Sequence, residues 1–338
     1  MARKTTRRAL VTGGAGFIGS HLVDRLIDSE WEITVLDNLS TGSAENLSHL
    51  SSRRLKIIEG SVADEKTVKE SIEDCEFVFH LAALADIVPS INDPMSYFRA
   101  NVSGTAIVMD AAKRHGVKKF VYAASSSCYG LPLAFPTPEN AAISPQYPYA
   151  LTKWLGEEIV RHWGSVYQIP WISLRLFNVF GPRSRTSGTY GAVLGVFLAQ
   201  KLAGKALTVV GDGNQSRDFT FVTDVARAFA QAAESPVQGE IFNVGSGGTY
   251  TVNHLTSLLG GERTMIPERP GEPRVTYADT RKISRALGWK PEVSFESGVE
   301  KVLAEIDYWK KAPVWEPDSI AAATVDWFKY LGNESQGR

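Results

Sequence analysis

Cysteine is scarce in this sequence: Cys75 and Cys128 are the only two among 338 residues, and no close spacing pairs them. This excludes a disulfide framework and a zinc site of the usual ligand spacing, so we expect no metal. Long apolar runs are also missing, since none reaches the roughly 20 residues that would cross a bilayer. We therefore expect no membrane-spanning segment.

An excess of charge of one sign is absent as well, because 36 basic residues balance 37 acidic ones to give a net charge of −1. Binding to nucleic acid or to an anionic membrane surface depends on an excess of positive charge. The basic stretch MARKTTRR is followed by an apolar segment too short for a signal-peptide core. We expect no nucleic-acid partner and no membrane partner, and a cytoplasmic location by exclusion.

What the first half of the chain does contain is a regular alternation of strand-like and helical patterns. The predicted strands are 8–12, 32–37, 55–60, 76–83, 118–125 and 171–177. The helical patterns between them cover 17–29, 64–74, 93–116 and a stretch from 147 onward. Such alternation is typical of a parallel sheet covered on both faces, and near-continuous apolar runs fit buried parallel strands. We predict an α/β fold with a doubly wound, Rossmann-type parallel sheet.

After residue 177 the pattern changes to that of a smaller, mixed α/β lobe. Residues 208–222 follow a strand–turn–strand pattern with the turn at GDGN. Asp224 is a candidate cap for the helix that follows, and Gly288 is a candidate stop for a later helix. The predicted division is a first domain at 1–177, on which 220–245 pack back, and a second at 178–338.

A glycine-rich turn joins the first strand to the first helix, where ALVTGGAGFIGSHLVDRL contains Gly13, Gly16 and Gly19. Glycines at these places allow a tight turn, close approach of the backbone to a diphosphate, and close packing of helix on strand. The free N–H groups at the start of the helix then point at the anion. The strand before the motif and the helix after it give the context that a dinucleotide site requires.

Asp37 ends the next strand, EITVLD, and supplies the acidic residue that completes this pattern. Its carboxylate can accept hydrogen bonds from the adenosine ribose hydroxyls and would repel a 2′-phosphate. The following NLSTG contains no arginine that could bind such a phosphate, which favours NAD over NADP. Asp64 could accept from the adenine amino group or cap a helix, and both roles are open.

Tyr149 and Lys153 lie four residues apart in a predicted helix, within QYPYALTK. Residues at this spacing share one helix face, so both side chains can reach the same cleft. A phenol with an ordinary pKa near 10 is a poor base, but a nearby ammonium together with a positively charged nicotinamide ring favours the phenolate and lowers that pKa. Next to a nicotinamide site, this pair predicts a proton acceptor for the oxidation of an alcohol.

Several motifs occur in an order that resembles the extended short-chain dehydrogenase/reductase family, particularly its nucleotide-sugar epimerases. These motifs are TGGAGFIGS, HLAA, SSSCYG, YALTK, RLFNVFGPR, GDGNQSRDFTFVTDVARA, FNVGSG and RPGEPRVTYAD. The resemblance covers nearly the whole chain and implies that residues 1–177 bind NAD and residues 178–338 bind a nucleotide sugar. Only residues 312–332 match no motif of the family.

The resemblance also implies individual roles. Tyr149 is the expected base, Lys153 its partner and a ligand of the nicotinamide ribose, and Ser125 a hydroxyl donor to the substrate oxygen. Ser126 and Ser127 are the next candidates for that hydroxyl. The predicted cofactor contacts are Gly13, Gly16, Phe17, Ile18, Gly19, Asp37, Asn38, Ser40, Thr41, Gly42, Asp64, Leu81, Ala82, Ala83, Tyr149 and Lys153.

Residues that follow Ser125 separate the reactions known for this family. Its 4,6-dehydratases carry an Asp-Glu pair where this chain has Ser126 and Ser127, and its decarboxylases carry a glutamate there. Epimerases acting at C3 and C5 use a cysteine, but Cys128 lies one residue closer to the tyrosine, which reverses its direction on a strand. A buried apolar role for Cys128 is favoured. Of the reactions known for the family, inversion at C4 through a transient 4-keto sugar is the one that these residues leave.

Substrate contacts are implied by the same comparison of motifs. Arg217 and Arg269 match arginines that bind the diphosphate. Glu272 matches an acidic residue on the substrate ribose, and Asn178 an asparagine near the diphosphate or sugar. Thr276 matches a position where a bulky residue in some 4-epimerases excludes N-acetyl groups. The predicted substrates are UDP-Glc/UDP-Gal, UDP-GlcNAc/UDP-GalNAc, or both.

Other functions stay open at this point. Arg183 and Arg185 leave room for a UDP-glucuronate 4-epimerase, and another oxidoreductase or dehydratase of the family is a further alternative. A non-catalytic NAD-binding protein is less favoured, because such proteins usually lose the tyrosine or the lysine. Family members commonly pair through two helices per subunit, which predicts a homodimer through a four-helix interface formed by 94–114 and 147–167.

Overall fold

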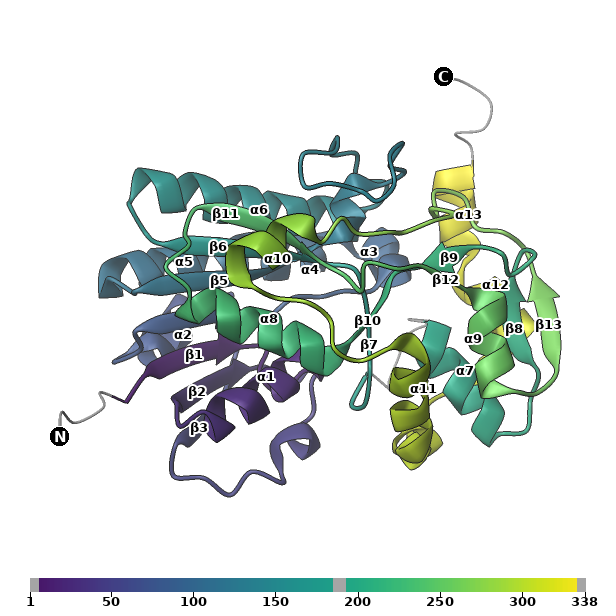
Figure 1. The fold of residues 1–338 in the computed structure, drawn as a ribbon, viewed down its shortest axis with the longest axis horizontal. Helices are drawn as coiled ribbons and strands as arrows, with labels where there is room; N and C mark the ends of the chain where they lie inside the picture. Colours follow the sequence, from purple (N-terminus) through teal and green to yellow (C-terminus); the bar gives the residue numbers. More distant parts are fainter. Residues whose placement is uncertain (1–5, 185–192, 333–338) are drawn as a thin grey trace.

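A seven-stranded parallel sheet forms the centre of the computed structural model, which describes residues 6–184 and 193–332 (Figure 1). The strand order is β11-β6-β5-β4-β1-β2-β3, and every neighbouring pair is parallel. The strands are β1 Arg8–Thr12, β2 Glu32–Asp37, β3 Leu55–Glu59, β4 Phe77–His80, β5 Lys119–Ser125, β6 Trp171–Leu176 and β11 Glu240–Val244.

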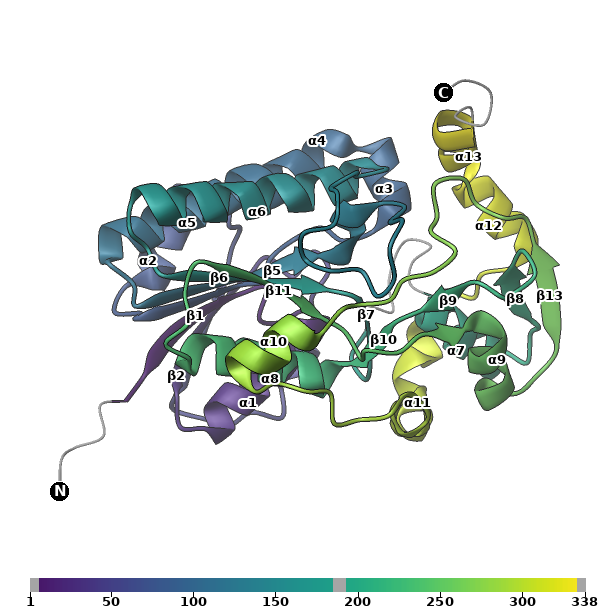
Figure 2. The ribbon, with the colours of Figure 1, turned by 45° about the horizontal axis from the view of Figure 1, so that its top comes forward.

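Helices cover both faces of this sheet, as Figures 1 and 2 show. One face carries α1 (Phe17–Asp28), α8 (Val222–Glu234) and α10 (Arg281–Leu287). The other carries α2 (Glu65–Ile72), α5 (Gly104–His115) and α6 (Pro148–Val166). A separate apolar core lies on each face, as expected for strands buried on both sides. The predicted doubly wound, Rossmann-type fold is confirmed.

The chain changes direction across the sheet at β1. From β1 it proceeds through β2 to β3 on one side, and it then returns to β4, β5 and β6 on the other. In open α/β sheets the crevice beyond the carboxyl ends of the strands at such a reversal is where ligands bind. The fold therefore places the Gly13–Gly19 turn and the ends of β4 and β5 at one site.

A long helical stretch supports the loop that follows β4. It consists of α4 (Pro94–Tyr97), a π-helical turn η2 (Phe98–Ser103) and α5. Within the π turn, the Oδ1 of Asn101 accepts from the Leu84 N–H at 2.8 Å, and its Nδ2 donates to the Thr152 hydroxyl at 3.0 Å. The Asn101 side chain thereby ties the loop after β4 to helix α6. Helix α3 (Ile87–Asn92) follows that loop.

The remaining residues form the smaller mixed lobe that the sequence predicts. Its strands pair as β8 with β13 and β9 with β12, while β7 pairs with β10. The strands are β7 Asn178–Phe180, β8 Leu207–Val210, β9 Ser216–Arg217, β10 Phe219–Phe221, β12 Tyr250–Thr251 and β13 Arg263–Ile266. The helices are α7 Val193–Leu202, α9 Val252–Leu259, α11 Phe295–Ala304, α12 Pro317–Ala323 and α13 Val325–Leu331.

Short helical turns occur in both parts of the chain. They are η1 Ala44–Leu47 and η3 Ser126–Tyr129 in the sheet-bearing part and η4 Ile306–Lys311 in the smaller lobe.

Residues 208–222 do not form the hairpin that the strand–turn–strand pattern suggests. Gly211 and Gly213 do make a turn, with φ values of 55° and 73°. The strands on either side nevertheless pair elsewhere, β8 with β13 and β10 with β7. Long-range partners of these short strands outweigh the local turn signal.

Asp224 is not the cap of helix α8, so that prediction is wrong. The helix begins two residues earlier, at Val222, and the Asp224 carboxylate accepts from the backbone N–H groups of Glu292 and Val293 at 3.0 Å each. The Asp224 carboxylate thus binds backbone N–H groups of a loop that is distant in sequence, and not those of its own helix. Gly288, with φ 67°, ends helix α10 as predicted.

No helix within 6–184 and 193–332 combines the length and the apolar content needed to span a bilayer. Residues after the predicted boundary at 177 also belong to the central sheet and its cover. Strand β11 pairs with β6, and helix α8 packs on α1. Residues 222–244 therefore lie against the central sheet. The division of the chain at residue 177 stays a prediction.

Candidate active site

A cavity of about 700 Å³ lies at the carboxyl ends of the sheet and is lined by both parts of the chain. It gathers every site residue that the sequence predicts except Asp64 and Lys153. The predicted residues that line it are Gly13, Gly16, Phe17, Ile18, Gly19, Asp37, Asn38, Ser40, Thr41, Gly42, Leu81, Ala82, Ala83, Ser125, Ser126, Ser127, Tyr149, Asn178, Arg217, Arg269, Glu272 and Thr276.

The glycine turn fits a diphosphate because two of its positions have no room for a side chain. A Cβ on Gly13, whose φ is 70°, would lie 2.7 Å from the Ala82 nitrogen. A Cβ on Gly19 would lie 2.1 Å from the Gly13 oxygen. Backbone therefore forms this wall of the cavity, and helix α1 begins there with its free N–H groups.

The Asp37 carboxylate is fixed at the edge of the same turn. It accepts from the Ala15 N–H at 3.0 Å and from the Leu39 N–H at 2.9 Å. Burial raises the pKa of Asp37, and these backbone bonds oppose that rise. A carboxylate held in this way can accept ribose hydroxyls, so the cavity fits the adenosine half of NAD.

Asp64 caps helix α2 and does not line the cavity. Its exposed carboxylate accepts from the Lys66 N–H at 3.1 Å and from the Thr67 hydroxyl, and the latter bond lowers the pKa of Asp64. Gly60, Ser61 and Val62 line the cavity instead. Of the two roles considered for Asp64, the structure shows the cap, while the adenine contact stays a prediction.

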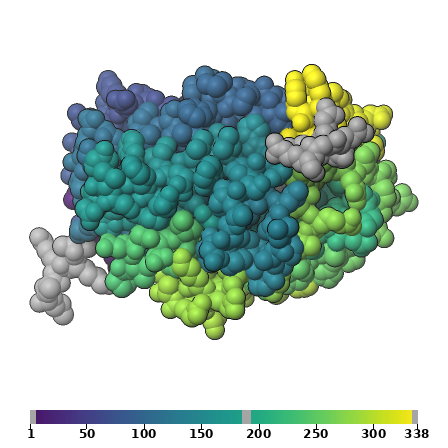
Figure 3. All heavy atoms as spheres, turned by 90° about the horizontal axis from the view of Figure 1, so that it is seen from above, coloured from purple at the N-terminus to yellow at the C-terminus, as the bar shows by residue number. Residues whose placement is uncertain are grey.

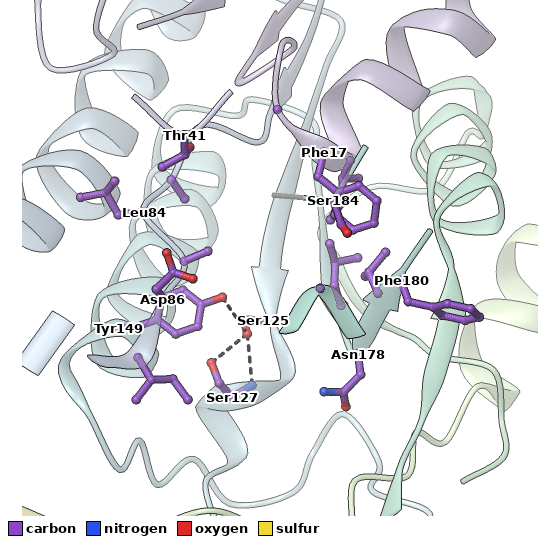
Figure 4. A pocket seen from close by; sticks show the side chains of 18 of the residues that line it. Phe17, Thr41, Leu84, Asp86, Ser125, Ser127, Tyr149, Asn178, Phe180 and Ser184 are labelled. Atoms are coloured by element: carbon purple, nitrogen blue, oxygen red, sulfur yellow. Dashed lines mark hydrogen bonds between the residues drawn. The ribbon is translucent and has the colours of Figure 1, made fainter. Parts of the chain in front are cut away.

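Tyr149 and Ser125 lie next to each other in the wall of the cavity (Figure 4). The Tyr149 hydroxyl donates to the Ser125 Oγ at 3.4 Å, and the Ser125 and Ser127 hydroxyls are 2.8 Å apart. Asp86, at the end of the loop after β4, lines the cavity beside Tyr149. Helix α6 and strand β5 thus bring together the Tyr149 phenol and the Ser125 hydroxyl, which are 24 residues apart in sequence.

The pKa of Tyr149 is raised rather than lowered in this structure. Burial is the main cause, the Ser125 hydrogen bond opposes it, and the charge of Asp86 adds to it. The protein's own side chains therefore do not lower this pKa, and the expected lowering, which counted a positively charged nicotinamide ring beside Lys153, stays a prediction. A phenolate here needs further positive charge in the cavity.

Lys153 is buried behind the cavity wall, with its Nζ 4.5 Å from the centre of the Tyr122 ring. Burial lowers the pKa of Lys153 to about 7, and the charge of Glu157 opposes this shift. Tyr149, Lys153 and Glu157 repeat at four-residue spacing along one face of helix α6. At neutral pH the charged and uncharged forms of this lysine are therefore close in free energy.

A buried ion pair that the sequence reading overlooked fixes this helix. Arg175 of β6 donates to both carboxylate oxygens of Glu157, at 2.6 to 3.1 Å, and the Ser173 hydroxyl donates at 2.8 Å. Arg175 also donates to the Tyr129 hydroxyl at 2.8 Å. The spacing of Glu157 after Lys153 and the place of Arg175 in RLFNVFGPR are signals that could have indicated it.

On the opposite wall, Arg217, Arg269 and Glu272 form one charged cluster. Arg217 donates to Glu272 at 2.8 Å, and an Arg269 nitrogen lies 3.9 Å from the other Glu272 oxygen. Two cations with one carboxylate leave a net positive charge for a diphosphate. Nearby, the Thr276 hydroxyl donates to the Asn178 Oδ1 at 2.8 Å. The predicted substrate residues thus lie on one wall.

Cys128 is buried against Tyr129, Phe177 and Ala278, as predicted, and it does not line the cavity. Burial raises the pKa of its thiol to about 12. It is therefore unsuited to act as an acid or base on a ligand in the cavity. Among the lining residues that were not predicted from the sequence are Asp86, Tyr147 and Trp327.

Comparison with known proteins agrees with this geometry. Residues 9–245 match the model of the NAD dependent epimerase/dehydratase family. The chain belongs to this family. Membership confirms both the resemblance drawn from the motifs and NAD as the cofactor.

Solved structures of this epimerase family include close neighbours of the chain. UDP-glucose 4-epimerase from Thermotoga maritima, solved with UDP-glucose, is 36% identical with a TM-score of 0.83, and the match covers 90% of this chain and 99% of that one. UDP-N-acetylglucosamine 4-epimerase from Methanobrevibacter ruminantium, in complex with UDP-N-acetylmuramic acid, is 34% identical with a TM-score of 0.83, covering 89% and 99%. UDP-glucuronic acid 4-epimerase from Bacillus cereus, solved with UDP-glucuronic acid and NAD, is 31% identical with a TM-score of 0.83, covering 90% and 99%.

Proposed function

We propose that this protein is an NAD-dependent epimerase that inverts C4 of a UDP-hexose, either UDP-Glc/UDP-Gal, UDP-GlcNAc/UDP-GalNAc or both. The observation that carries this proposal is the pairing of Tyr149 with Ser125 in a cavity whose adjacent wall residues, Ser126 and Ser127, carry no carboxylate. Elimination or decarboxylation needs an acidic group at those two positions. Hydroxyls alone support transfer of the O4 proton.

In the proposed reaction, Tyr149 takes the proton from the sugar O4 while Ser125 donates a hydrogen bond to the same oxygen. NAD held at the Gly13–Gly19 turn and Asp37 would supply the hydride chemistry that inversion at C4 requires. Tyr149 then gives the proton back to O4. The cationic nicotinamide and Lys153 supply the positive charge that a Tyr149 phenolate requires.

Asp86 and Arg183 favour a neutral hexose over a uronate. The Asp86 carboxylate lies beside Tyr149 in the cavity and would repel the carboxylate of a uronate. Arg183 also lines the cavity, but its guanidinium donates to Asp24 at 2.7 Å, so it is already paired. Arg185 lies outside the described residues.

Thr276 favours tolerance of an N-acetyl group. Its small side chain lines the cavity, and its hydroxyl donates to the Asn178 Oδ1 at 2.8 Å and accepts from the Asp218 N–H at 3.0 Å. The diphosphate would lie on Arg217 and Arg269, with Glu272 toward the ribose. This is the arrangement that the motifs imply.

The proposal is tested by incubating the purified protein with UDP-Glc, UDP-GlcNAc and UDP-GlcA separately, without added NAD. Proton NMR should show inversion at C4 for one or both neutral sugars, and borohydride should trap a 4-keto sugar. If only UDP-GlcA is inverted, the substrate is a UDP-uronate and not a UDP-hexose. Absence of inversion with all three, or steady release of NADH, would overturn the proposal.

We also propose a homodimer through the helices at 94–114 and 147–167. Both helices carry exposed apolar side chains that a four-helix interface would cover. These side chains are Met95, Phe98, Leu151 and Val166. Light scattering after gel filtration should give twice the chain mass, and Phe98→Glu should give a monomer whereas Met265→Glu, on an exposed site of β13, should not. A cytoplasmic location stays a prediction.

A further inference from the structure

The last described residues form a segment that the family motifs leave unassigned. This C-terminal segment, residues 312–331, contains helices α12 and α13 and lies well beyond the end of the family match at residue 245. In Figures 1 and 2 it is the yellow pair of helices beside β8 and β13. Figure 3 shows its yellow residues at one end of the molecule, next to blue residues of the sheet-bearing part.

The C-terminal segment contributes directly to the cavity wall. Ala312, Pro313, Trp315 and Trp327 line the same cavity as Arg269 and Glu272. The Trp315 carbonyl accepts from the buried Gln200 amide at 2.7 Å, which fixes the start of the segment to helix α7. Helix α13 at its other end contacts α3, the helix that follows Asp86. The segment therefore bridges the two parts of the chain that enclose the cavity.

Trp327 is the side chain through which the segment reaches the predicted diphosphate contacts. It is only 3% exposed. Its indole Nε1 donates to the Pro270 carbonyl at 2.8 Å, and the Arg269 guanidinium carbon lies 5.5 Å from the centre of its ring. One side chain thus contacts both the backbone and the charged head of the Arg269 loop.

The Arg269 guanidinium lies beside the Trp327 ring. This guanidinium is largely buried, and burial lowers its pKa, with the charge of Glu272 opposing. Glu272 lies 3.9 Å from Arg269 but is hydrogen-bonded to Arg217 at 2.8 Å, so the carboxylate is shared. An aromatic face attracts a guanidinium and restricts where it can lie. A loop ordered before the ligand arrives loses less conformational entropy on binding.

We propose that Trp327 is a positioning residue for substrate binding: it holds the Arg269 loop so that the guanidinium faces the diphosphate of the nucleotide sugar. The C-terminal segment is thereby a functional part of the site and not only an addition to the second lobe. This inference rests on the proposed nucleotide-sugar substrate but not on the reaction at C4.

The test compares UDP with uridine as ligands of the NAD-containing protein, by isothermal titration calorimetry. Trp327→Leu should weaken UDP about tenfold and leave uridine within about twofold, because only the diphosphate contacts the Arg269 guanidinium. Trp327→Phe keeps a ring but loses the hydrogen bond to Pro270, and it should weaken UDP about threefold. In turnover, KM for the active UDP-sugar should rise by similar factors while kcat stays within about twofold.

A double-variant cycle separates positioning from simple packing. Arg269→Gln should weaken UDP by itself, and adding Trp327→Leu should cause little further loss if Trp327 acts through Arg269. Full additivity of the two losses would overturn the proposal, and so would equal weakening of UDP and uridine. Trp309→Phe is the matched control, since this buried tryptophan of η4 has an indole N–H without a partner among the described residues. It should leave UDP binding unchanged.

Stability and chemistry are controlled separately. Melting temperature and bound NAD are measured for each variant, and Trp327→Phe carries the test if Trp327→Leu fails to fold. A protein that binds UDP as described but inverts no sugar would contradict the proposed epimerase reaction and leave this inference standing. Failure of the unaltered protein to bind UDP would overturn both.

Discussion

The Tyr149 hydroxyl donates to the Ser125 Oγ at 3.4 Å, and both side chains line a cavity that is also lined by a glycine turn and an arginine cluster. Burial keeps this phenol protonated in the protein alone by raising its pKa. The same burial would strengthen any interaction with a cationic ring placed next to it, because charges interact more strongly away from water. The site thus suits a base that ionises only when the cofactor is present.

Replacing Tyr149 by phenylalanine should remove the proton acceptor and leave the cavity otherwise intact. Loss of a general base typically costs about 10²- to 10⁴-fold in rate. We expect kcat for C4 inversion to fall within that range, measured by NMR, while the bound NAD content is unchanged. Tyr167→Phe, at the opposite end of helix α6, is the control and should keep full activity. Unreduced turnover in the Tyr149 variant would refute its role as the base.

Asp37→Asn should weaken NAD binding and reduce discrimination against NADP. Loss of a hydrogen bond to a charged group costs about 1.5–3 kcal/mol, or roughly 10- to 100-fold in affinity. Equilibrium dialysis with both cofactors, on protein freed of bound nucleotide, measures the change. Asp28→Asn, on the exposed end of helix α1, should have no effect. An unchanged preference for NAD would show that Asp37 does not contact the ribose.

The pKa of Lys153, lowered to about 7 by burial, predicts a pH-dependent stability. Between pH 7 and the ordinary lysine value of 10.5, the unfolded chain holds this proton and the folded chain releases it. Stability rises with pH wherever the unfolded state binds more protons. The free energy of unfolding should therefore increase across this window, with a limiting slope of about 1.4 kcal/mol per pH unit from this one group.

Lys153→Met removes this titration and isolates its contribution. Urea unfolding of NAD-free protein at pH 6.5, 8 and 9.5 gives the difference between the two proteins at each pH. The variant should be the more stable at pH 6.5, and its advantage should shrink as pH rises. A difference that is constant over the three pH values would contradict a lowered pKa.

Thr276→Tyr should narrow the range of substrates if Thr276 faces the C2 substituent. Overfilling a packed site typically costs about 1–3 kcal/mol, which is roughly a factor of 5 to 150 in affinity. We expect the KM for UDP-GlcNAc to rise by about that factor while the KM for UDP-Glc changes less than threefold. Thr276→Ser keeps the hydrogen bond to Asn178 and serves as the control. Equal losses for both sugars would place Thr276 away from the N-acetyl group.

Parts of the structure with strong local patterns were predictable from sequence. Strands 8–12 and 32–37 coincide with β1 and β2, because strands buried on both faces carry continuous apolar runs. The glycine turn was equally clear, since only glycine fits where a Cβ would meet backbone at 2.7 Å or less. The role of Asp224 and the pairing of the strands on either side of the GDGN turn were not predicted correctly, because distant residues there compete with the local signal.

The amino-acid sequence by itself determined the strand–helix alternation, the glycine turn with Asp37, and the four-residue spacing of Tyr149 and Lys153. Each of these depends on neighbours in the chain and on backbone geometry. Tertiary structure alone decided the pKa shifts, the Glu157–Arg175 pair that fixes helix α6, and the contact of Trp327 with the Arg269 loop. Burial and long-range contacts cause these features, and local sequence spacing indicates at most a candidate residue, not its burial or its partner.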